Sequence, residues 1–233
     1  MRVLVTRPVG EGERLAQLLR ERGHEPILSP ALDVHFEDGP ELSLDGAQAI
    51  VATSANAVRA LAGRTEEREI PVFAVGPQTT EAARTAGFAM VRGANGDSRA
   101  LAQKVSQWTP PGAGKLFYAA GDASTDDLVN ALSQQGFYVE VMRFYRATER
   151  ATLSHAAATG LRSENIDAVM LYSPRSARVF LQQVVRAGLQ KECGKIIALC
   201  ISRAVAEALP LLPFADIRIA AQPNRDAMLD LLG

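Results

Sequence analysis

The chain has 233 residues, of which 47% are hydrophobic and 22% charged, so it is globular rather than disordered and has room for one large or two small domains. Its 25 lysines and arginines balance 26 acidic residues without any run of like charges, which argues against a nucleic-acid partner. The first apolar run stops at Thr6, too early for a signal peptide or a membrane span, so we expect a cytoplasmic protein with no membrane partner.

Short apolar runs alternate with helical patterns along the chain. In the first half, the runs 2–5, 49–53 and 71–75 precede helical patterns over 12–22, 56–62 and 79–86. In the second half, the runs 115–120, 168–172 and 196–201 precede helical patterns over 125–135, 176–187 and 204–209. Each run is a predicted strand, and each pattern is a helix with one apolar face. Repeated βα units of this kind predict an α/β fold with parallel sheets.

The two halves of the chain align residue by residue. An offset of 113 residues places Leu15 on Leu128 and Leu19 on Leu132, which repeats the core face of one helix. Offsets of 119 and about 126 align the later units in the same order, and small insertions between units explain the drift. We interpret this series as an internal duplication.

Two segments, 27–38 and 138–150, alternate like strands and are not followed by a helical pattern of their own. Each lies where the chain would leave one lobe for the other, whereas 109–114 reads as a turn within a lobe. Two crossings between lobes imply that one domain is built from discontinuous sequence.

Hydroxyl groups and small residues follow six of the predicted strands, where open α/β sheets bind their ligands. These residues are Thr6 and Arg7, Thr53 and Ser54, Gly76 to Thr79, Gly121 and Asp122, Tyr172 and Ser173, and Ser202 and Arg203. Serine and threonine at such junctions are commonly helix N-caps, so capping is the alternative interpretation at any single position. As a set, they predict a cleft of amide donors, hydroxyls and arginines suited to a polycarboxylate.

No metal or nucleotide site is expected. Cys193 and Cys200 have no second pair of cysteines or histidines at zinc-like spacing, and the three histidines are isolated. The stretch from Gly10 to Gly12 lacks the GxGxxG pattern, and GxxxxGK does not occur. We therefore expect a function that needs neither a metal nor an organic cofactor.

Four stretches resemble the uroporphyrinogen-III synthases in order and spacing: VLVTRP at the start, TSANAV from Thr53, AVGPQTTEAARTAGF from Ala74 and GDSRALA from Gly96. The resemblance covers essentially the whole chain. It implies two flavodoxin-like, three-layer lobes with parallel sheets, joined by a two-stranded crossover. The implied domains are residues 1–35 with 150–233 and residues 42–144, with linkers 36–41 and 145–149 and the substrate between the domains.

The resemblance also implies an activity. The protein would be a monomeric lyase that cyclises hydroxymethylbilane, a polycarboxylate, with inversion of ring D and loss of water, giving uroporphyrinogen III in haem biosynthesis. The residues matched to the family cleft are Thr53, Ser54, Gly76, Thr79 and Tyr145, with Ser173 and Ser202 as their counterparts in the other lobe. Arg7 joins them as a binding residue at the first strand end, and Tyr145 would donate a proton to the leaving hydroxyl group.

The chain departs from the family pattern in two stretches. CISRAVAEAL from Cys200 stands in place of a second Gly-Pro-Thr-Thr turn, and no arginine follows Gly121. Two other classes of protein stay open. A two-lobed module could bind an organic anion without catalysis, although such modules are often exported or fused to an output domain. A flavodoxin-like electron carrier is disfavoured because the first strand lacks a phosphate loop rich in serine and threonine.

Overall fold

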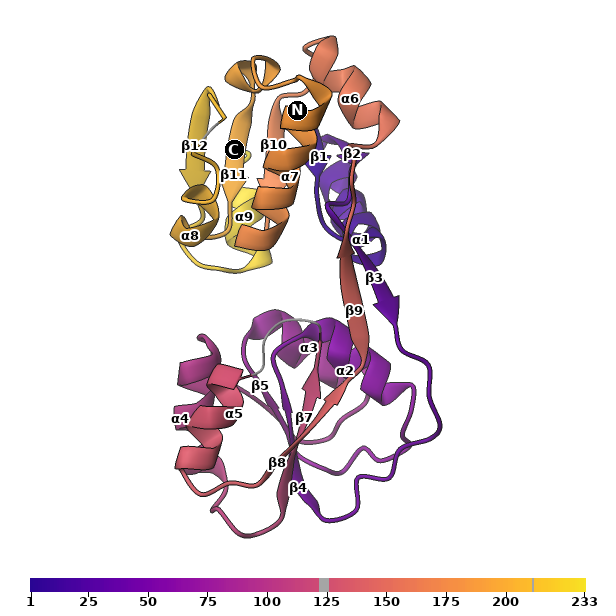
Figure 1. The fold of residues 1–233 in the computed structure, drawn as a ribbon, viewed down its shortest axis with the longest axis vertical. Coiled ribbons are helices and arrows are strands. Elements are labelled where there is room, and N and C mark those ends of the chain that lie inside the picture. Colours follow the sequence, from indigo (N-terminus) through magenta and orange to yellow (C-terminus); the bar gives the residue numbers. More distant parts are fainter. Residues whose placement is uncertain (122–125, 211) are drawn as a thin grey trace. The chain divides into compact units, whose positions relative to one another are not determined.

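The computed structural model describes residues 1–121, 126–210 and 212–233. The chain forms two compact units. Lobe 1 comprises Met1–Val34 and Thr148–Gly233, and lobe 2 comprises His35–Ala147 (Figure 1).

Lobe 1 contains a five-stranded parallel sheet in the order β12-β11-β10-β1-β2. Its strands are β1 (Arg2–Val5), β2 (Glu25–Leu28), β10 (Ala168–Leu171), β11 (Ile197–Cys200) and β12 (Asp216–Ile219). Its helices are α1 (Val9–Glu21), α6 (His155–Arg162), α7 (Pro174–Ala187), the 3-10 helix η1 (Glu192–Lys195), α8 (Arg203–Ala206) and α9 (Arg225–Asp230). Leu4 packs with α6 and α7 on one face, and Val3 and Val5 pack with α1 and α9 on the other.

Lobe 2 contains a second five-stranded parallel sheet, in the order β6-β5-β4-β7-β8. Its strands are β4 (Ala47–Ala52), β5 (Val72–Ala74), β6 (Val91–Gly93), β7 (Lys115–Ala120) and β8 (Val139–Arg143). Its helices are α2 (Ala55–Ala62), α3 (Pro77–Thr85), α4 (Ser98–Trp108) and α5 (Asp126–Gln134). Phe117 packs in the layer of α2 and α3, and Tyr118 packs in the layer of α4 and α5.

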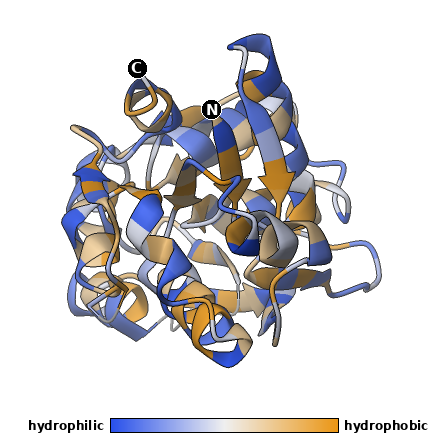
Figure 2. Cartoon of the chain, turned by 90° about the horizontal axis from the view of Figure 1, so that it is seen from above, coloured by the Kyte–Doolittle hydropathy of each residue, from blue (hydrophilic) through white to orange (hydrophobic). Residues whose placement is uncertain are grey.

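The central strands are apolar over most of their length because both of their faces are covered by helices. In Figure 2 the strands in the interior are largely in hydrophobic colour, whereas the helices carry both colours. In β7, for example, the four consecutive residues Leu116, Phe117, Tyr118 and Ala119 are all buried. The predicted α/β class with parallel, helix-covered sheets is confirmed.

The two sheets share one topology. Read from β1, the strands of lobe 1 lie in the spatial order 2-1-3-4-5, which is the flavodoxin-like order. Lobe 2 has the same spatial order when its strands are numbered 1 to 5 in the sequence β7, β8, β4, β5, β6. Lobe 2 is therefore a circular permutation of lobe 1, and the offset of 113 residues found in the sequence aligns β1 with β7.

The two remaining strands connect the lobes. They are β3 (Leu32–Phe36) and β9 (Tyr145–Glu149), and they pair as a two-stranded sheet. Both lie within the segments whose alternation predicted extended crossovers.

The turn before β7 is constrained at Gly114, whose φ is +151°. A Cβ at this position would lie 2.7 Å from the carbonyl oxygen of Gly46 and 3.1 Å from the amide nitrogen of Gln48, both backbone atoms. Gly112 also has a positive φ, but a Cβ there would meet nothing within 4 Å.

We predict that Gly114→Ala lowers the free energy of unfolding of lobe 2 by about 2–4 kcal/mol, since the clash adds to the backbone strain. The matched Gly112→Ala variant should lose about 1 kcal/mol, because it suffers the strain alone. Urea denaturation of the two variants measures the difference, and equal losses would contradict the role of the close approach.

Candidate functional site

In each sheet, two neighbouring central strands send their helices to opposite faces. In lobe 2, β4 leads into α2 in one layer and β7 leads into α5 in the other. In lobe 1, β1 leads into α1 and β10 into α7, again in opposite layers. Open α/β sheets bind ligands beyond the carboxyl ends of the strands at such a switch point.

Two hydroxyl groups meet at the switch point of lobe 2. Thr53 follows β4, and its Oγ1 lies 2.9 Å from the phenol oxygen of Tyr118 in β7. Burial raises the pKa of Tyr118 above its ordinary value, while the hydrogen bond to Thr53 lowers it in part and the nearby Tyr145 raises it further. The phenol of Tyr118 therefore stays protonated at neutral pH, and this pair is uncharged.

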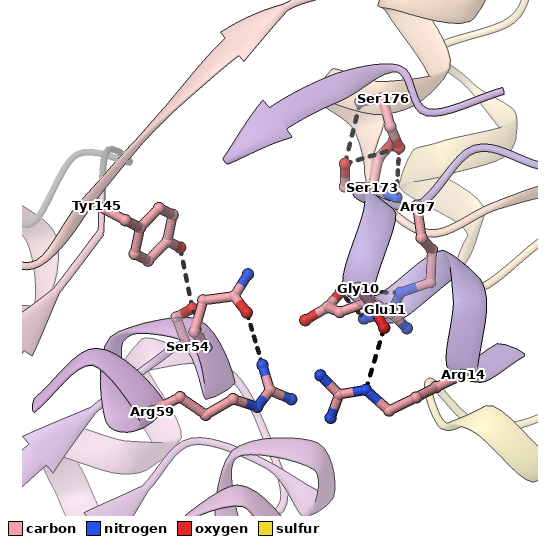
Figure 3. A network of polar contacts seen from close by, with 10 residues as sticks. Arg7, Gly10, Glu11, Arg14, Ser54, Arg59, Tyr145, Ser173 and Ser176 are labelled. Carbon is pink, nitrogen blue, oxygen red and sulfur yellow. Dashed lines mark hydrogen bonds and ion pairs between the residues drawn. The ribbon is translucent and has the colours of Figure 1, made fainter. Parts of the chain in front are cut away.

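A second hydroxyl pair joins the crossover strand to the start of α2. The phenol of Tyr145 donates a hydrogen bond of 2.9 Å to Oγ of Ser54 (Figure 3). Ser54 is the N-cap of α2, and its oxygen also accepts a hydrogen bond of 3.2 Å from the backbone N–H of Asn56. Because this oxygen already accepts two hydrogen bonds, its own hydrogen is the part of the group that can be offered to a ligand.

The ring of Tyr145 is held between two neighbours. It packs edge-on against Phe36, with the ring centroids 6.3 Å apart. On another side lies Gly121, where a Cβ would fall inside the space occupied by the Tyr145 ring. The residue after β7 must therefore be glycine if Tyr145 is to reach Ser54.

A guanidinium group lies close to the same helix start. Arg59 donates a hydrogen bond of 2.6 Å to Oδ1 of Asn56 (Figure 3). The first turn of α2 contains no acidic residue, so the positive end of the helix is not neutralised within that turn. The cap of α2 thus combines a hydroxyl donor, backbone N–H groups and a cation.

The start of α3 lies further along the same sheet edge, after the neighbouring strand β5. Gly76 is its N-cap in an extended conformation, and a side chain there would meet nothing within 4 Å. The carbonyl of Gly76 accepts hydrogen bonds of 3.0 Å from the backbone N–H and from the hydroxyl of Thr80. Thr79 is only 4% exposed, so the backbone at Gly76 is more approachable than the Thr79 side chain.

In lobe 1 the switch point is closed by internal contacts. Thr6 donates a hydrogen bond of 2.8 Å to the carbonyl of Met170 across the two central strands. Arg7 forms an ion pair with Glu11 and lies over the ring of Tyr172 at 4.5 Å. Burial raises the pKa of Tyr172 to about 12, against the lowering effect of Arg7. The charge of Arg7 is therefore matched within its own lobe.

The two serines predicted in lobe 1 cap helices differently. Ser173 caps α7 in a capping box: its Oγ accepts a hydrogen bond of 3.0 Å from the N–H of Ser176, whose Oγ accepts one of 3.2 Å from the N–H of Ser173 (Figure 3). Ser202 precedes the four-residue helix α8 and makes no side-chain cap bond. Arg203 beside it is exposed, and its guanidinium forms no hydrogen bond or ion pair within the described chain.

The structure thus brings Thr53 to Tyr118 and Ser54 to Tyr145, while Gly76 and Thr79 lie at the next helix start on the same sheet edge. The sequence did not identify Tyr118 or Arg59 as site residues, nor the steric role of Gly121. Asp122, named with Gly121 at its strand end, lies outside the described residues.

The described ranges contain neither a metal-binding cluster of side chains nor a membrane-spanning helix. No group of three or more His, Cys, Asp or Glu side chains among those residues is placed to hold a metal ion. No helix among them is long and apolar enough to cross a membrane.

The chain is similar in sequence and fold to one family. A family model described as uroporphyrinogen-III synthase HemD matches residues 13–230, whereas comparison with curated proteins found no match. The solved uroporphyrinogen-III synthetase of Helicobacter pylori is similar with a TM-score of 0.62 at 18% identity, over 100% of this chain and 98% of that chain. A mutant uroporphyrinogen III synthase of Thermus thermophilus has a TM-score of 0.56 at 18% identity, over 100% and 97% of the two chains. At this identity the structures establish the fold.

We predict that Ser173→Ala and Ser202→Ala differ in stability. Ser173→Ala removes a capping box and should lower the free energy of unfolding by about 1 kcal/mol. Ser202→Ala removes no cap bond and should change it by less than about 0.5 kcal/mol. Thermal unfolding of both variants tests the contrast, and an equal loss in the two would show that Ser202 also caps its helix in solution.

Proposed function

The chain belongs to the uroporphyrinogen-III synthase family, the cyclising lyases of tetrapyrrole biosynthesis, and we infer that it closes hydroxymethylbilane to uroporphyrinogen III. The reaction inverts ring D and releases one water. Family membership rests on the match over residues 13–230. The assignment of roles to individual residues below is our proposal, and the hydroxyl pairs at the switch point of lobe 2 are the observation that carries it.

We assign binding of substrate carboxylates in lobe 2 to the starts of α2 and α3. The Ser54 hydrogen, the N–H groups of the first helical turns and the Arg59 guanidinium are all donors, and helix N-termini favour anions. Gly76 keeps the start of α3 open to a ligand because it has no side chain. Charge-assisted hydrogen bonds of this kind fix both the place and the orientation of a carboxylate.

In lobe 1 we assign the corresponding role to Ser202 and Arg203, with Ser173 contributing through its hydroxyl. The Arg203 guanidinium has no partner in the described chain, so its charge can be used by a ligand without breaking an ion pair. Arg7 is already paired with Glu11. We therefore propose that it contributes to substrate binding from its position over the Tyr172 ring. Many weak donors that hold one folded shape of the substrate would favour inversion over simple closure.

Tyr145 is proposed to assist departure of the hydroxyl group. As the C–O bond breaks, its O–H gives a proton to the leaving oxygen, which departs as water. The proton that ring D releases when its aromaticity is restored returns to the tyrosinate, so the net change is loss of one water. The hydrogen bond from Tyr145 to Ser54 must open for this transfer.

We propose that the protein works as a monomer in the cytoplasm without a cofactor. Its two cysteines, Cys193 and Cys200, are both unpaired and buried, in keeping with a reducing compartment. Every group assigned above acts by hydrogen bonding or charge, and none of these roles requires a metal.

The activity is tested by adding hydroxymethylbilane, oxidising the product and separating the uroporphyrin isomers by chromatography. We expect isomer III to predominate, at a rate above that of spontaneous closure. Dialysis against a chelator should leave this rate unchanged. Isomer I alone, formed at the spontaneous rate, would contradict the proposed function.

We predict that Tyr145→Phe keeps the fold, loses about tenfold in rate and still yields isomer III. This loss is smaller than the roughly 10²–10⁴-fold typical of an obligatory general acid, because the Tyr145 proton is shared with Ser54 and the substrate also loses its hydroxyl slowly unaided. A Phe variant with full rate would remove Tyr145 from the mechanism, and one that yields mostly isomer I would assign it to control of substrate shape.

Gly121→Ala gives the same test without removing the phenol. Its Cβ displaces the Tyr145 ring from Ser54, so the rate should fall at least as far as in Tyr145→Phe. Gly63→Ala is the matched control, because a Cβ at Gly63 makes only ordinary contacts, the nearest at 3.6 Å. The control should keep the wild-type rate.

A further inference from the structure

Lobe 2 contains a cavity of about 330 Å³ at the end of its sheet opposite the switch point. Its walls include Gln48 near the start of β4, Met90 just before β6, and Trp108 and Thr109 where α4 ends. These positions lie at the amino ends of the strands, whereas Thr53 and Gly76 follow the carboxyl ends. None of the residues assigned to the proposed reaction lines this cavity.

One wall of the cavity is aromatic. The rings of Phe73 and Trp108 lie with their centroids 5.1 Å apart at an angle of 51°. Phe73 is buried, while Met90, which also lines the cavity, is 50% exposed, so its thioether is accessible to a ligand. Aromatic faces and a flexible thioether suit a flat apolar ring.

Among the polar side chains that line the cavity, one cation is available to bind a ligand. Thr109 donates a hydrogen bond of 2.8 Å to Oε1 of Gln48, whose Nε2 donates one of 2.7 Å to the carbonyl of Gly114, so these side chains satisfy one another. Arg92 is the one charged residue among the lining residues, and its guanidinium forms no hydrogen bond or ion pair within the described chain. It is the cross-strand neighbour of Phe73 and so lies on the same face of the sheet.

We propose that this cavity binds a planar carboxylate with one or two aromatic rings. The ring lies against Phe73, Trp108 and Met90, and the carboxylate pairs with Arg92, whose planar fork matches it in a bidentate manner. The volume is at the lower end of the range for small-molecule sites, so a substrate of four pyrrole rings is too large for it. The cavity is therefore a second ligand site, separate from the substrate site.

Trp108 makes the site directly observable, because it is the single tryptophan of the chain. Titration with 2-naphthoate should quench its fluorescence in a saturable way, with a Kd of about 1 mM or tighter for a ligand of this size. The neutral analogue 2-naphthamide serves as the matched probe and should bind roughly tenfold more weakly, since it lacks the charge. Calorimetry should give the same Kd for each probe.

Two variants of lining residues and one control variant test the proposed binding mode. Arg92→Gln should bring the affinity for 2-naphthoate down to that for 2-naphthamide. Ala89→Phe should abolish binding of both probes, because Ala89 is an exposed lining residue whose enlargement fills the cavity without touching the core. The control Arg84→Gln removes an equally exposed arginine from α3, in the other layer of the lobe, and should leave both affinities unchanged.

The proposal is overturned if quenching does not saturate, if acid and amide bind wild-type protein equally, or if Arg84→Gln weakens binding as much as Arg92→Gln. Melting curves of all three variants verify that they fold. Arg92→Gln should retain its full rate with hydroxymethylbilane, so that failure of this proposal and failure of the proposed reaction give different results.

Discussion

A parallel sheet must be covered on both faces, and this constraint governs the architecture of each lobe. Every parallel connection has to return across a face, so the helices divide between two layers and all the strands end at one edge. Where central strands send their helices to opposite layers, at β4 and β7 and at β1 and β10, helix N-termini and strand-end hydroxyls come together at one edge of the sheet. The places of Thr53, Ser54 and Ser173 follow from this topology.

The same constraint explains which elements the sequence revealed. Central strands read as continuous apolar runs because both of their faces are buried, as in β7 and β10. The edge strands β6 and β12 did not stand out, since β12 is the exposed stretch DIRI and β6 has only three residues. The helix expected over 204–209 ends at Ala206, after which the N–H groups of Ala208 and Leu209 bond to carbonyls three residues earlier in a tightened turn, and Pro210 cannot continue the helix.

The sequence predicted several hydroxyl groups of the site, but it did not predict which side chains hydrogen-bond to one another. Ser54 and Tyr145 were both named from the sequence, yet their hydrogen bond joins residues 91 positions apart, which no local pattern encodes. Tyr118 was hidden because it reads as one more core residue of an apolar strand, and the reason for Gly121 lies in a ring from a distant strand. Arg7 had a local signal, since Glu11 lies one helical turn away, and that spacing favours an ion pair within the helix start over a ligand contact.

The circular permutation of the lobes has a consequence for synthesis on the ribosome. Lobe 2 is one continuous segment and can fold as soon as it has emerged. In lobe 1, β1 cannot pair with β10 until β10 has been synthesised, and the carbonyl that accepts the Thr6 hydrogen bond lies 164 residues downstream. At roughly 5–20 residues per second, that delay is on the order of ten seconds. Throughout it, the edge of β1 that pairs with β10 has no partner strand, and such unpaired strand edges are where nascent chains aggregate. Lobe 1 is thus begun before lobe 2 and completed after it, and chaperone protection of β1 during this interval would guard the nascent chain against aggregation.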